Sequence, residues 1–323
     1  MHEIHGTLLR ISKETGLPVK KILDMLFFLR GGEVENNKLV QKLGVSKNVL
    51  NQVKQKLSDL FEPPSTVTAL SGKGRELTDL LFPEGYRPEE ELWVNLRDVR
   101  FIQIQKLLQK YKGLRPEPFR KYDQFTATVE TTARRAALID FFADVQGKNL
   151  LFLGDDDFTS VAVSAYGTAK TVSVLDIDER ILRGIRTISD KDKFQIRCER
   201  YDARGELPKK FTGAFDVVFT DPPYTQTGIS LFVSRAIEAL DPANLAGRIY
   251  CCYGNSDRAK ERFLPIYEVF GHSGLMIRWI FDKLNRYDGA ESIGSTSSLF
   301  VCDVTPKTKP VIKGDYDGAI YTG

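Results

Sequence analysis

The sequence predicts an α/β protein whose main domain is preceded by a smaller helical domain. Its 323 residues exceed the usual length of a single domain. From Tyr122 onward, helical segments alternate with short apolar strands, which is typical of a parallel sheet with crossover helices. We therefore expect an N-terminal domain over residues 1–83, a linker with a connecting helix over 84–121, a main domain over 122–304 and a C-terminal tail over 305–323.

The N-terminal part has the pattern of a winged helix. Between Lys38 and Leu60, a glycine turn at Gly44 and a serine N-cap at Ser46 separate two helical segments, which is a helix-turn-helix pattern. A short strand from Val67 and a helix start at Gly72 would complete the domain. Two functions fit this pattern: a structural or dimerising module, or DNA binding through the second helix, at Lys47, Asn48, Gln52 and Lys54.

The overall composition excludes several classes of protein. The formal net charge of +3 is too small for a protein that wraps nucleic acid, so we expect no nucleic-acid partner. No apolar run approaches the roughly 18 residues of a membrane span. The four cysteines lack the paired spacing of a zinc site, and we expect buried free thiols in a cytoplasmic protein.

Three consecutive carboxylates follow the first predicted strand of the main domain. A helix over Thr131–Phe142 precedes this strand, Asn149–Leu153, which leads into Gly154, Asp155, Asp156 and Asp157. Adjacent like charges disfavour joint ionisation unless cations balance them, so the expected ligand is cationic. A solvated turn, an N-cap for the next helix and a divalent metal site are the alternatives. No further ligand spacing supports a metal, and we assign no metal ligand.

The next two predicted strands also end in acids. Thr171–Leu175 leads into Asp176 and Asp178, about 20 positions after the first loop, where an acidic residue can bind ribose hydroxyls. Asp176 is our candidate for that role. The segment Arg197–Ala203 should close the third strand, with Asp202 near the exocyclic amine of an adenine. Together these acids indicate an adenosine ligand without phosphate.

The fourth predicted strand, Phe215–Thr220, runs into Asp221, Pro222, Pro223 and Tyr224. The prolines fix the backbone so that the carboxylate, the Pro222 carbonyl and the tyrosine ring face one pocket. A carboxylate and a carbonyl accept hydrogen bonds from an amine, and an aromatic face stabilises positive charge. The turn therefore suits an amine nucleophile; a surface proline turn is the alternative.

These strand-end residues resemble those of class I adenosylmethionine-dependent methyltransferases, which have a Rossmann-like fold. A more specific resemblance is to the branched-chain polyamine synthases of thermophiles, the N(4)-bis(aminopropyl)spermidine synthases. Their Gly-Asp-Asp-Asp motif is similar to Gly154–Asp157, and their Asp-Pro-Pro-Tyr turn to Asp221–Tyr224. The segments from Tyr122 to Thr128, which contains Gln124, and from Asn285 to Ser292 are also similar to segments of that family.

The resemblance implies transfer of two aminopropyl groups from decarboxylated S-adenosylmethionine to the central amine of spermidine. Methylthioadenosine would be the by-product, and no cofactor would be required. We expect Asp157 to be the base, with Asp221 as the other candidate, and Asp156 and Tyr224 as further catalytic residues. The expected donor-binding residues are Gly154, Asp155, Asp176, Asp178, Asp202, Gln124 and Pro222. The expected assembly is a homodimer with no membrane contact.

Two other functions remain open at this level. An amino-methyltransferase acting on DNA or RNA would explain the Asp221–Tyr224 turn, but three aspartates would repel phosphates. A DNA-binding regulator could use the main domain only to sense a nucleoside or polyamine. The tail contains Asp315, Tyr316, Asp317 and Tyr321, and we expect it to be a mobile lid that closes over the acceptor.

Overall fold

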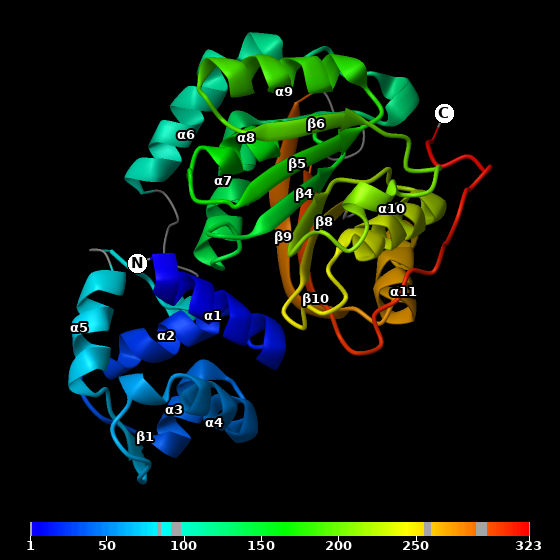
Figure 1. Ribbon diagram of the computed structural model, residues 1–323. Coiled ribbons are helices and arrows are strands. Elements are labelled where there is room, and N and C mark those ends of the chain that lie inside the picture. The colour runs from blue at the N-terminus through cyan, green and yellow to red at the C-terminus, as the bar shows by residue number, and fades with distance from the viewer. Residues whose placement is uncertain (1, 83–84, 92–97, 255–259, 289–295, 323) are drawn as a thin grey trace. The chain divides into compact units, whose positions relative to one another are not determined.

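The computed structural model describes residues 2–82, 85–91, 98–254, 260–288 and 296–322 (Figure 1). The chain divides into two compact units. One comprises Met1–Leu96 with Phe141–Asp144, and the other comprises Arg97–Asp140 with Val145–Gly323. In the part of the chain that is described, no helix is both long enough and apolar enough to cross a membrane.

The first unit is mainly helical. Its helix ends follow local rules: Ser46 accepts a hydrogen bond from the backbone N–H of Val49 at the start of α4, and Gly44 ends α3 in the left-handed region. A two-stranded antiparallel sheet pairs Val34 with Thr68. Its elements are α1 (His2–Thr15), α2 (Val19–Leu29), β1 (Val34–Glu35), α3 (Asn36–Leu43), α4 (Lys47–Lys56), β2 (Val67–Thr68) and α5 (Gly72–Leu81).

The second unit is built on an eight-stranded sheet of order β3-β9-β10-β8-β7-β4-β5-β6. Its strands are β3 (Thr126–Ala127), β4 (Asn149–Leu153), β5 (Thr171–Asp176), β6 (Ile196–Arg200), β7 (Val217–Thr220), β8 (Arg248–Gly254), β9 (Met276–Asp288) and β10 (Thr296–Asp303). The central strands are apolar and buried, as strands covered by helices must be. Its helices are α6 (Val99–Lys110), α7 (Val129–Phe141), α8 (Thr159–Ser164), α9 (Glu179–Lys191), α10 (Gln226–Ala239) and α11 (Pro265–His272).

Strand direction confirms the predicted Rossmann-like α/β domain. The strands from β6 to β8 run parallel, whereas β10 is antiparallel to both of its neighbours. Helices α8 and α9 pack on β5 and β6, and α10 packs on β4, β7 and β8. Chain order reverses between β4 and β7, so the sheet has its switch point there, at the place where α/β folds bind ligands.

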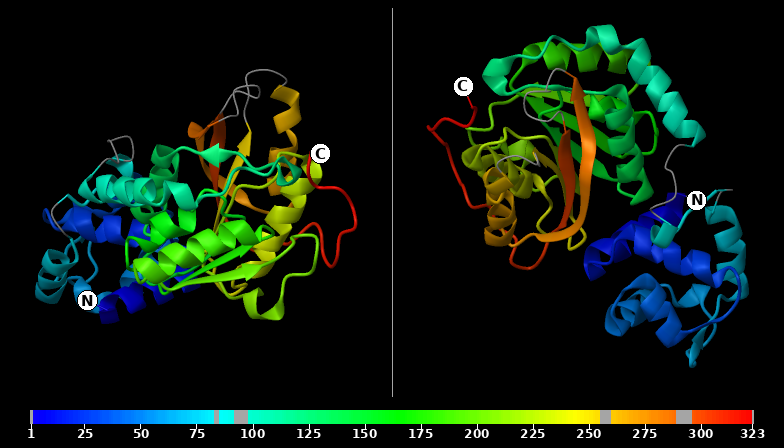
Figure 2. Two further views of the ribbon diagram at one scale, coloured as in Figure 1. Left: turned by 90° about the horizontal axis from the view of Figure 1, so that it is seen from above. Right: turned by 180° about the vertical axis from the view of Figure 1, so that it is seen from behind.

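The tail after β10 forms neither helix nor strand but packs against the second unit. Its backbone bonds to α10, where Ser234 Oγ accepts from the N–H groups of Val311 and Ile312. Ile320 is only 1% exposed within the main core. Figure 2 shows this segment running along the outside of the unit beside α10 and α11. The sequence led us to expect a mobile segment, because the composition of the tail does not reveal these contacts.

Candidate active site

The loops after β4, β5 and β7 meet around one pocket. Gly154 leaves β4 with a positive φ of 74°, a conformation that glycine adopts without strain and that turns the chain toward Asp155. The pocket has a volume of about 320 Å³. Of the residues proposed from sequence, it is lined by Gln124, Gly154, Asp155, Asp156, Asp176, Asp221, Pro222 and Tyr224. Asp157, Asp178 and Asp202 do not line it.

One end of the pocket is formed around Asp176, the last residue of β5. Its carboxylate oxygens accept the backbone N–H groups of Asp155 at 2.9 Å and Asp178 at 2.8 Å. Burial raises the pKa of Asp176 to about 6, although the backbone hydrogen bonds lower it. Asp176 is therefore held in a fixed orientation at the edge of the pocket.

Asp178 and Asp202 have local partners instead. Asp178 is the N-cap of α9, accepts a hydrogen bond from Gln124 at 3.2 Å, and is paired with Arg180. Asp202 lies beyond the end of β6 and forms an ion pair with Arg204. The strand predicted to end at Ala203 ends at Arg200, and Ala203 itself lines the pocket.

The three aspartates after Gly154 have three different environments. Asp155 is buried and caps α8, accepting the backbone N–H groups of Thr159 at 2.7 Å and Ser160 at 3.1 Å. Burial raises its pKa to about 8. Asp155 thus satisfies N–H groups in the first turn of α8, although the N-cap position itself is Phe158.

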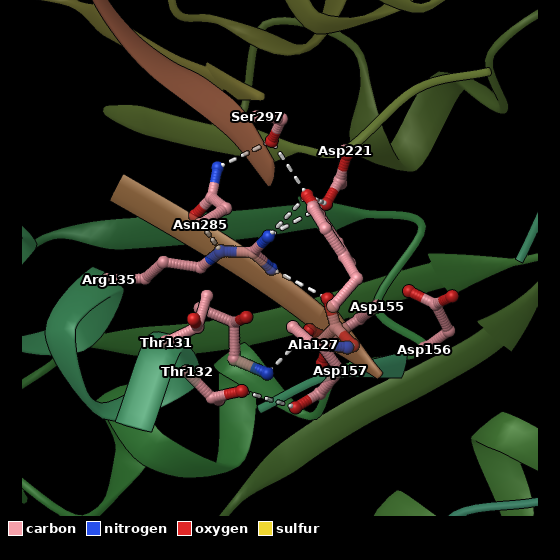
Figure 3. Close-up of polar contacts among 12 residues, drawn as sticks. Ala127, Thr131, Thr132, Arg135, Asp155, Asp156, Asp157, Asp221, Asn285 and Ser297 are labelled. Carbon is pink, nitrogen blue, oxygen red and sulfur yellow. Dashed lines mark hydrogen bonds and ion pairs between the residues drawn. The ribbon is translucent and has the colours of Figure 1, made fainter. Parts of the chain in front are cut away.

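Asp157 is buried and bound to two arginines. Its Oδ1 atom accepts from Arg115 at 2.6 Å and from the Ala127 backbone N–H at 2.6 Å, and its Oδ2 atom accepts from Arg135 at 2.8 Å. Both oxygens face protein donors rather than the pocket (Figure 3). Neither oxygen is therefore directed at a ligand in the pocket.

Asp155 and Asp156 both line the pocket, but only Asp155 has its carboxylate bonded to backbone N–H groups of α8. Among the described residues, the Asp156 carboxylate has no hydrogen-bond partner, and Figure 3 shows it apart from Arg135. Burial raises its pKa well above the usual range, and the charges of Asp157 and Asp221 raise it further. Asp156 is thus a carboxylate with a raised pKa that a ligand in the pocket can reach.

Asp221 lies across the pocket, after β7, and is held by two tyrosines and an arginine. Tyr224 donates to its Oδ1 atom at 3.0 Å, whereas Tyr287 donates to Oδ2 at 2.7 Å. Arg135 bonds the same Oδ2 atom at 2.8 Å. Burial raises the pKa values of both phenols, so they remain hydrogen-bond donors at neutral pH. The pocket therefore combines carboxylates with aromatic rings, which suits an organic cation.

The tail reaches the pocket at its Asp176 end. Tyr321 and Thr322 line it, and the Tyr321 ring lies 5.6 Å from that of Tyr122. The Thr322 backbone N–H donates to Asp123 at 2.8 Å. Thr225, which follows the Asp-Pro-Pro-Tyr turn, donates to the carbonyl of Ile320 at 2.7 Å.

Sequence reasoning did not identify Arg115, Arg135 or Tyr287 as functional residues. Arg135 lies within a correctly predicted helix, where a charged residue usually faces solvent, yet it is 0% exposed. Tyr287 belongs to a segment that we compared with the polyamine synthases but to which we assigned no role. The part of that segment after Asp288 lies outside the described residues. In the described ranges, no group of three or more His, Cys, Asp or Glu side chains is arranged to hold a metal.

Comparison with known proteins agrees with this geometry. Residues 103–314 match the family model described as the branched-chain polyamine synthase A C-terminal domain. The chain belongs to the branched-chain polyamine synthase family. N(4)-bis(aminopropyl)spermidine synthase of Thermococcus kodakarensis is 33% identical over 226 residues, which is 68% of this chain and 63% of that protein.

Two other comparisons extend this result. An uncharacterized protein of Methanocaldococcus jannaschii, MJ0675, is 37% identical over 70% of this chain and 56% of its own length. These alignments therefore span about three fifths of the curated relatives. The crystal structure of the Thermus thermophilus branched-chain polyamine synthase, with N4-aminopropylspermidine and 5'-methylthioadenosine, has a TM-score of 0.62 at 20% identity. It covers 98% of this chain and 97% of that one, so the two share a fold.

Proposed function

We propose that this protein transfers aminopropyl groups from decarboxylated S-adenosylmethionine to the central secondary amine of spermidine. The products would be N(4)-aminopropylspermidine, then N(4)-bis(aminopropyl)spermidine, with methylthioadenosine released at each step. The observation that carries this proposal is the position of Asp156, which lines a pocket of carboxylates and tyrosines and forms no ion pair with another described residue. Family membership and the ligands of the Thermus thermophilus relative support it.

The acidity of the pocket favours a decarboxylated donor. The donor's nucleoside would lie at the Asp176 end, where Tyr201, Ala203 and Tyr321 supply apolar surface. Its side chain would then point toward Asp156 and Asp221. A carboxylate on that side chain would face two like charges, whereas the ammonium of an aminopropyl group would be attracted.

The chemistry needs a neutral amine and a positioned base. The spermidine nitrogen forms a bond to the aminopropyl carbon beside the sulfonium, the carbon–sulfur bond breaks, and its electron pair leaves with methylthioadenosine. Before the first attack, a base must remove the ammonium proton of the central nitrogen. The sulfonium is already a good leaving group, so orientation and charge supply most of the remaining acceleration.

We assign the base to Asp156 rather than to Asp157, our candidate from sequence. Asp156 is open to the pocket and has a raised pKa, whereas both oxygens of Asp157 are held by Arg115, Arg135 and a backbone N–H. Asp221 and Tyr224 would stabilise the positive charge on the acceptor. The second transfer makes a quaternary nitrogen, which has no N–H to donate and depends on these charged and aromatic contacts.

Product analysis tests the proposal. The full chain is incubated with spermidine and either decarboxylated or intact S-adenosylmethionine, and the products are separated by mass spectrometry. We expect masses of one and two added aminopropyl groups with the decarboxylated donor. Methylated DNA or RNA with the intact donor would support a methyltransferase instead, and no product with either donor would support a sensor.

For the first unit, we propose a winged-helix domain over residues 1–83 that supports folding or dimerisation rather than reading DNA. Lys54, one of the four candidate DNA contacts, is engaged with Asn36 and Thr68 of its own unit. The expected homodimer and cytoplasmic location belong to the same proposal. Sedimentation of the full chain tests the dimer, and fractionation of cells that express it tests the location.

We also propose that the tail gates the pocket. The expectation from sequence was a lid over the acceptor, but Tyr321 and Thr322 lie with Tyr122 and Asp123, near Asp176. The gated ligand would therefore be the nucleoside. A tail closed in this way would have to open to release methylthioadenosine.

A further inference from the structure

Asp157 and Asp221 do not have the same number of cationic partners. Asp157 has Arg115, Arg135 and a backbone N–H as partners. Asp221 lines the pocket, and its only ion pair within the described residues is with Arg135. One guanidinium is therefore shared by a carboxylate that faces the ligand and one that does not.

Arg135 is held rigidly in that position. The side chain is 0% exposed, and its Nη1 and Nη2 atoms lie 2.8 Å from Asp157 Oδ2 and Asp221 Oδ2, respectively. Its Nε atom donates to Asn285 Oδ1 at 2.8 Å, and Nη2 also bonds the Tyr287 hydroxyl at 2.9 Å. Figure 3 shows the guanidinium reaching between these groups. A planar fork with fixed donors can orient a carboxylate, which a flexible ammonium does less well.

The ionisation of Asp221 depends on this contact. Burial raises the pKa of Asp221, and the Arg135 charge is the main influence that lowers it. Among the described residues, the next largest influences on Asp221 are the charge of Asp157, which raises its pKa, and the hydrogen bonds of Tyr287 and Tyr224, which lower it. The titratable and charged groups facing it are Arg135, Asp156, Asp157, Tyr224, Cys252 and Tyr287.

We propose that Arg135 is a positioning residue that keeps Asp221 ionised and directed at the cationic acceptor by bridging it to Asp157. This inference rests on the proposed function, since it assumes a polyamine in the pocket. If Arg135 is lost, Asp157 keeps Arg115 and the backbone N–H, whereas Asp221 loses its cation, so its pKa rises and it is protonated more readily. The pocket then loses a negative charge where the acceptor binds.

A purely structural role for Arg135 is the competing explanation, and pH separates the two. Arg135→Met removes the charge and keeps much of the length. We expect spermidine to bind at least about tenfold more weakly to the variant near neutral pH, which corresponds to one unit of pKa. The deficit should shrink as pH rises and Asp221 ionises again. Spermidine itself also titrates with pH, but this affects both proteins equally, so we compare the ratio of the variant's affinity to that of the wild type.

Binding is measured by calorimetry with spermidine alone, so the result does not depend on turnover. Arg134→Met is the matched control, because Arg134 is a partly exposed neighbour on α7 that pairs with Glu130. Arg135→Lys keeps the positive charge but lacks the planar guanidinium. The ratio of its spermidine affinity to that of the wild type should not change with pH. Methylthioadenosine affinity should be unchanged in all three variants, because the proposed nucleoside end is formed around Asp176, whereas the partners of Arg135 are Asp157, Asp221, Asn285 and Tyr287.

A ratio for Arg135→Met that stays constant with pH would overturn the proposal and leave only a structural role. If that variant does not fold, Tyr287→Phe provides the test. It removes the 2.7 Å bond to Asp221 and should give a smaller deficit with the same pH dependence. A flat ratio in Tyr287→Phe would then overturn the proposal. Failure of the proposed function appears differently, as wild-type protein that binds no spermidine or forms no aminopropylated product.

Discussion

Exchanging Asp156 and Asp157 for asparagine, one at a time, separates catalysis from stability. Asp156→Asn keeps the shape of the side chain but removes its charge and basicity. We expect turnover to fall by about a hundredfold or more, as loss of a positioned base usually does. The melting temperature should hardly change, because no described residue donates a hydrogen bond to this carboxylate.

The same change at Asp157 should lower the stability of the folded protein. Asp157 balances two arginines, and its two oxygens accept three hydrogen bonds. An asparagine carries no charge and turns an N–H₂ group toward one of these donors. Breaking a buried ion pair costs about 3–5 kcal/mol. For a domain of this size, that corresponds to roughly 6–20 °C in melting temperature.

The assay combines calorimetric melting with chromatographic measurement of methylthioadenosine release. Asp190→Asn is the control, because Asp190 is exposed on α9 in the same unit. Its melting temperature and turnover should match the wild type. A normal rate for Asp156→Asn, together with a stable but inactive Asp157→Asn, would refute the reasoning and return the role of base to Asp157.

Three further predictions concern the donor, the tail and the first unit. Asp176→Ala should weaken methylthioadenosine binding about tenfold or more and leave spermidine binding unchanged. In the wild type, the calorimetric affinity for methylthioadenosine should fall as pH drops below about 6, because the protonated Asp176 no longer offers a carboxylate to the ribose hydroxyls. Ile320→Ala should lower the free energy of unfolding by about 2–5 kcal/mol, since the side chain is fully buried, and an unchanged melting curve would mean that the tail is not anchored there. In a mobility-shift assay with genomic DNA at physiological salt, the full chain should give no shifted band, and a discrete salt-sensitive complex would argue for DNA binding.

Much of the site was predictable because strand ends in a parallel sheet converge. Asp176 ends one strand, and Asp156 and Asp221 follow two others, so the pattern of apolar runs alone places them at one edge of the sheet. The roles within the Asp-Asp-Asp run were not predictable in this way. Neighbouring side chains point in different directions, and which one faces the pocket depends on backbone angles after Gly154 that composition does not contain.

Arg135 was missed for a different reason. Arg135 lies on α7, whereas its partners come from the loops after β4 and β7 and from β9, 22 to 152 residues away along the chain. A single arginine within a helical pattern does not indicate contacts with residues so distant in the sequence. The long antiparallel strand β9, which supplies Asn285 and Tyr287, was not predicted either, since the search followed acids at the ends of parallel strands.

The Arg135 guanidinium, which pairs with both Asp157 and Asp221, also restricts which substitutions this sequence can accept during evolution. Replacing Asp157 or Asp221 alone leaves part of a buried guanidinium without its counter-charge, and replacing Arg135 alone leaves two carboxylates facing each other's field. Each single step is costly even where a complete exchange of the trio would be tolerated. We therefore expect these three positions to be retained or lost together among descendants of this chain.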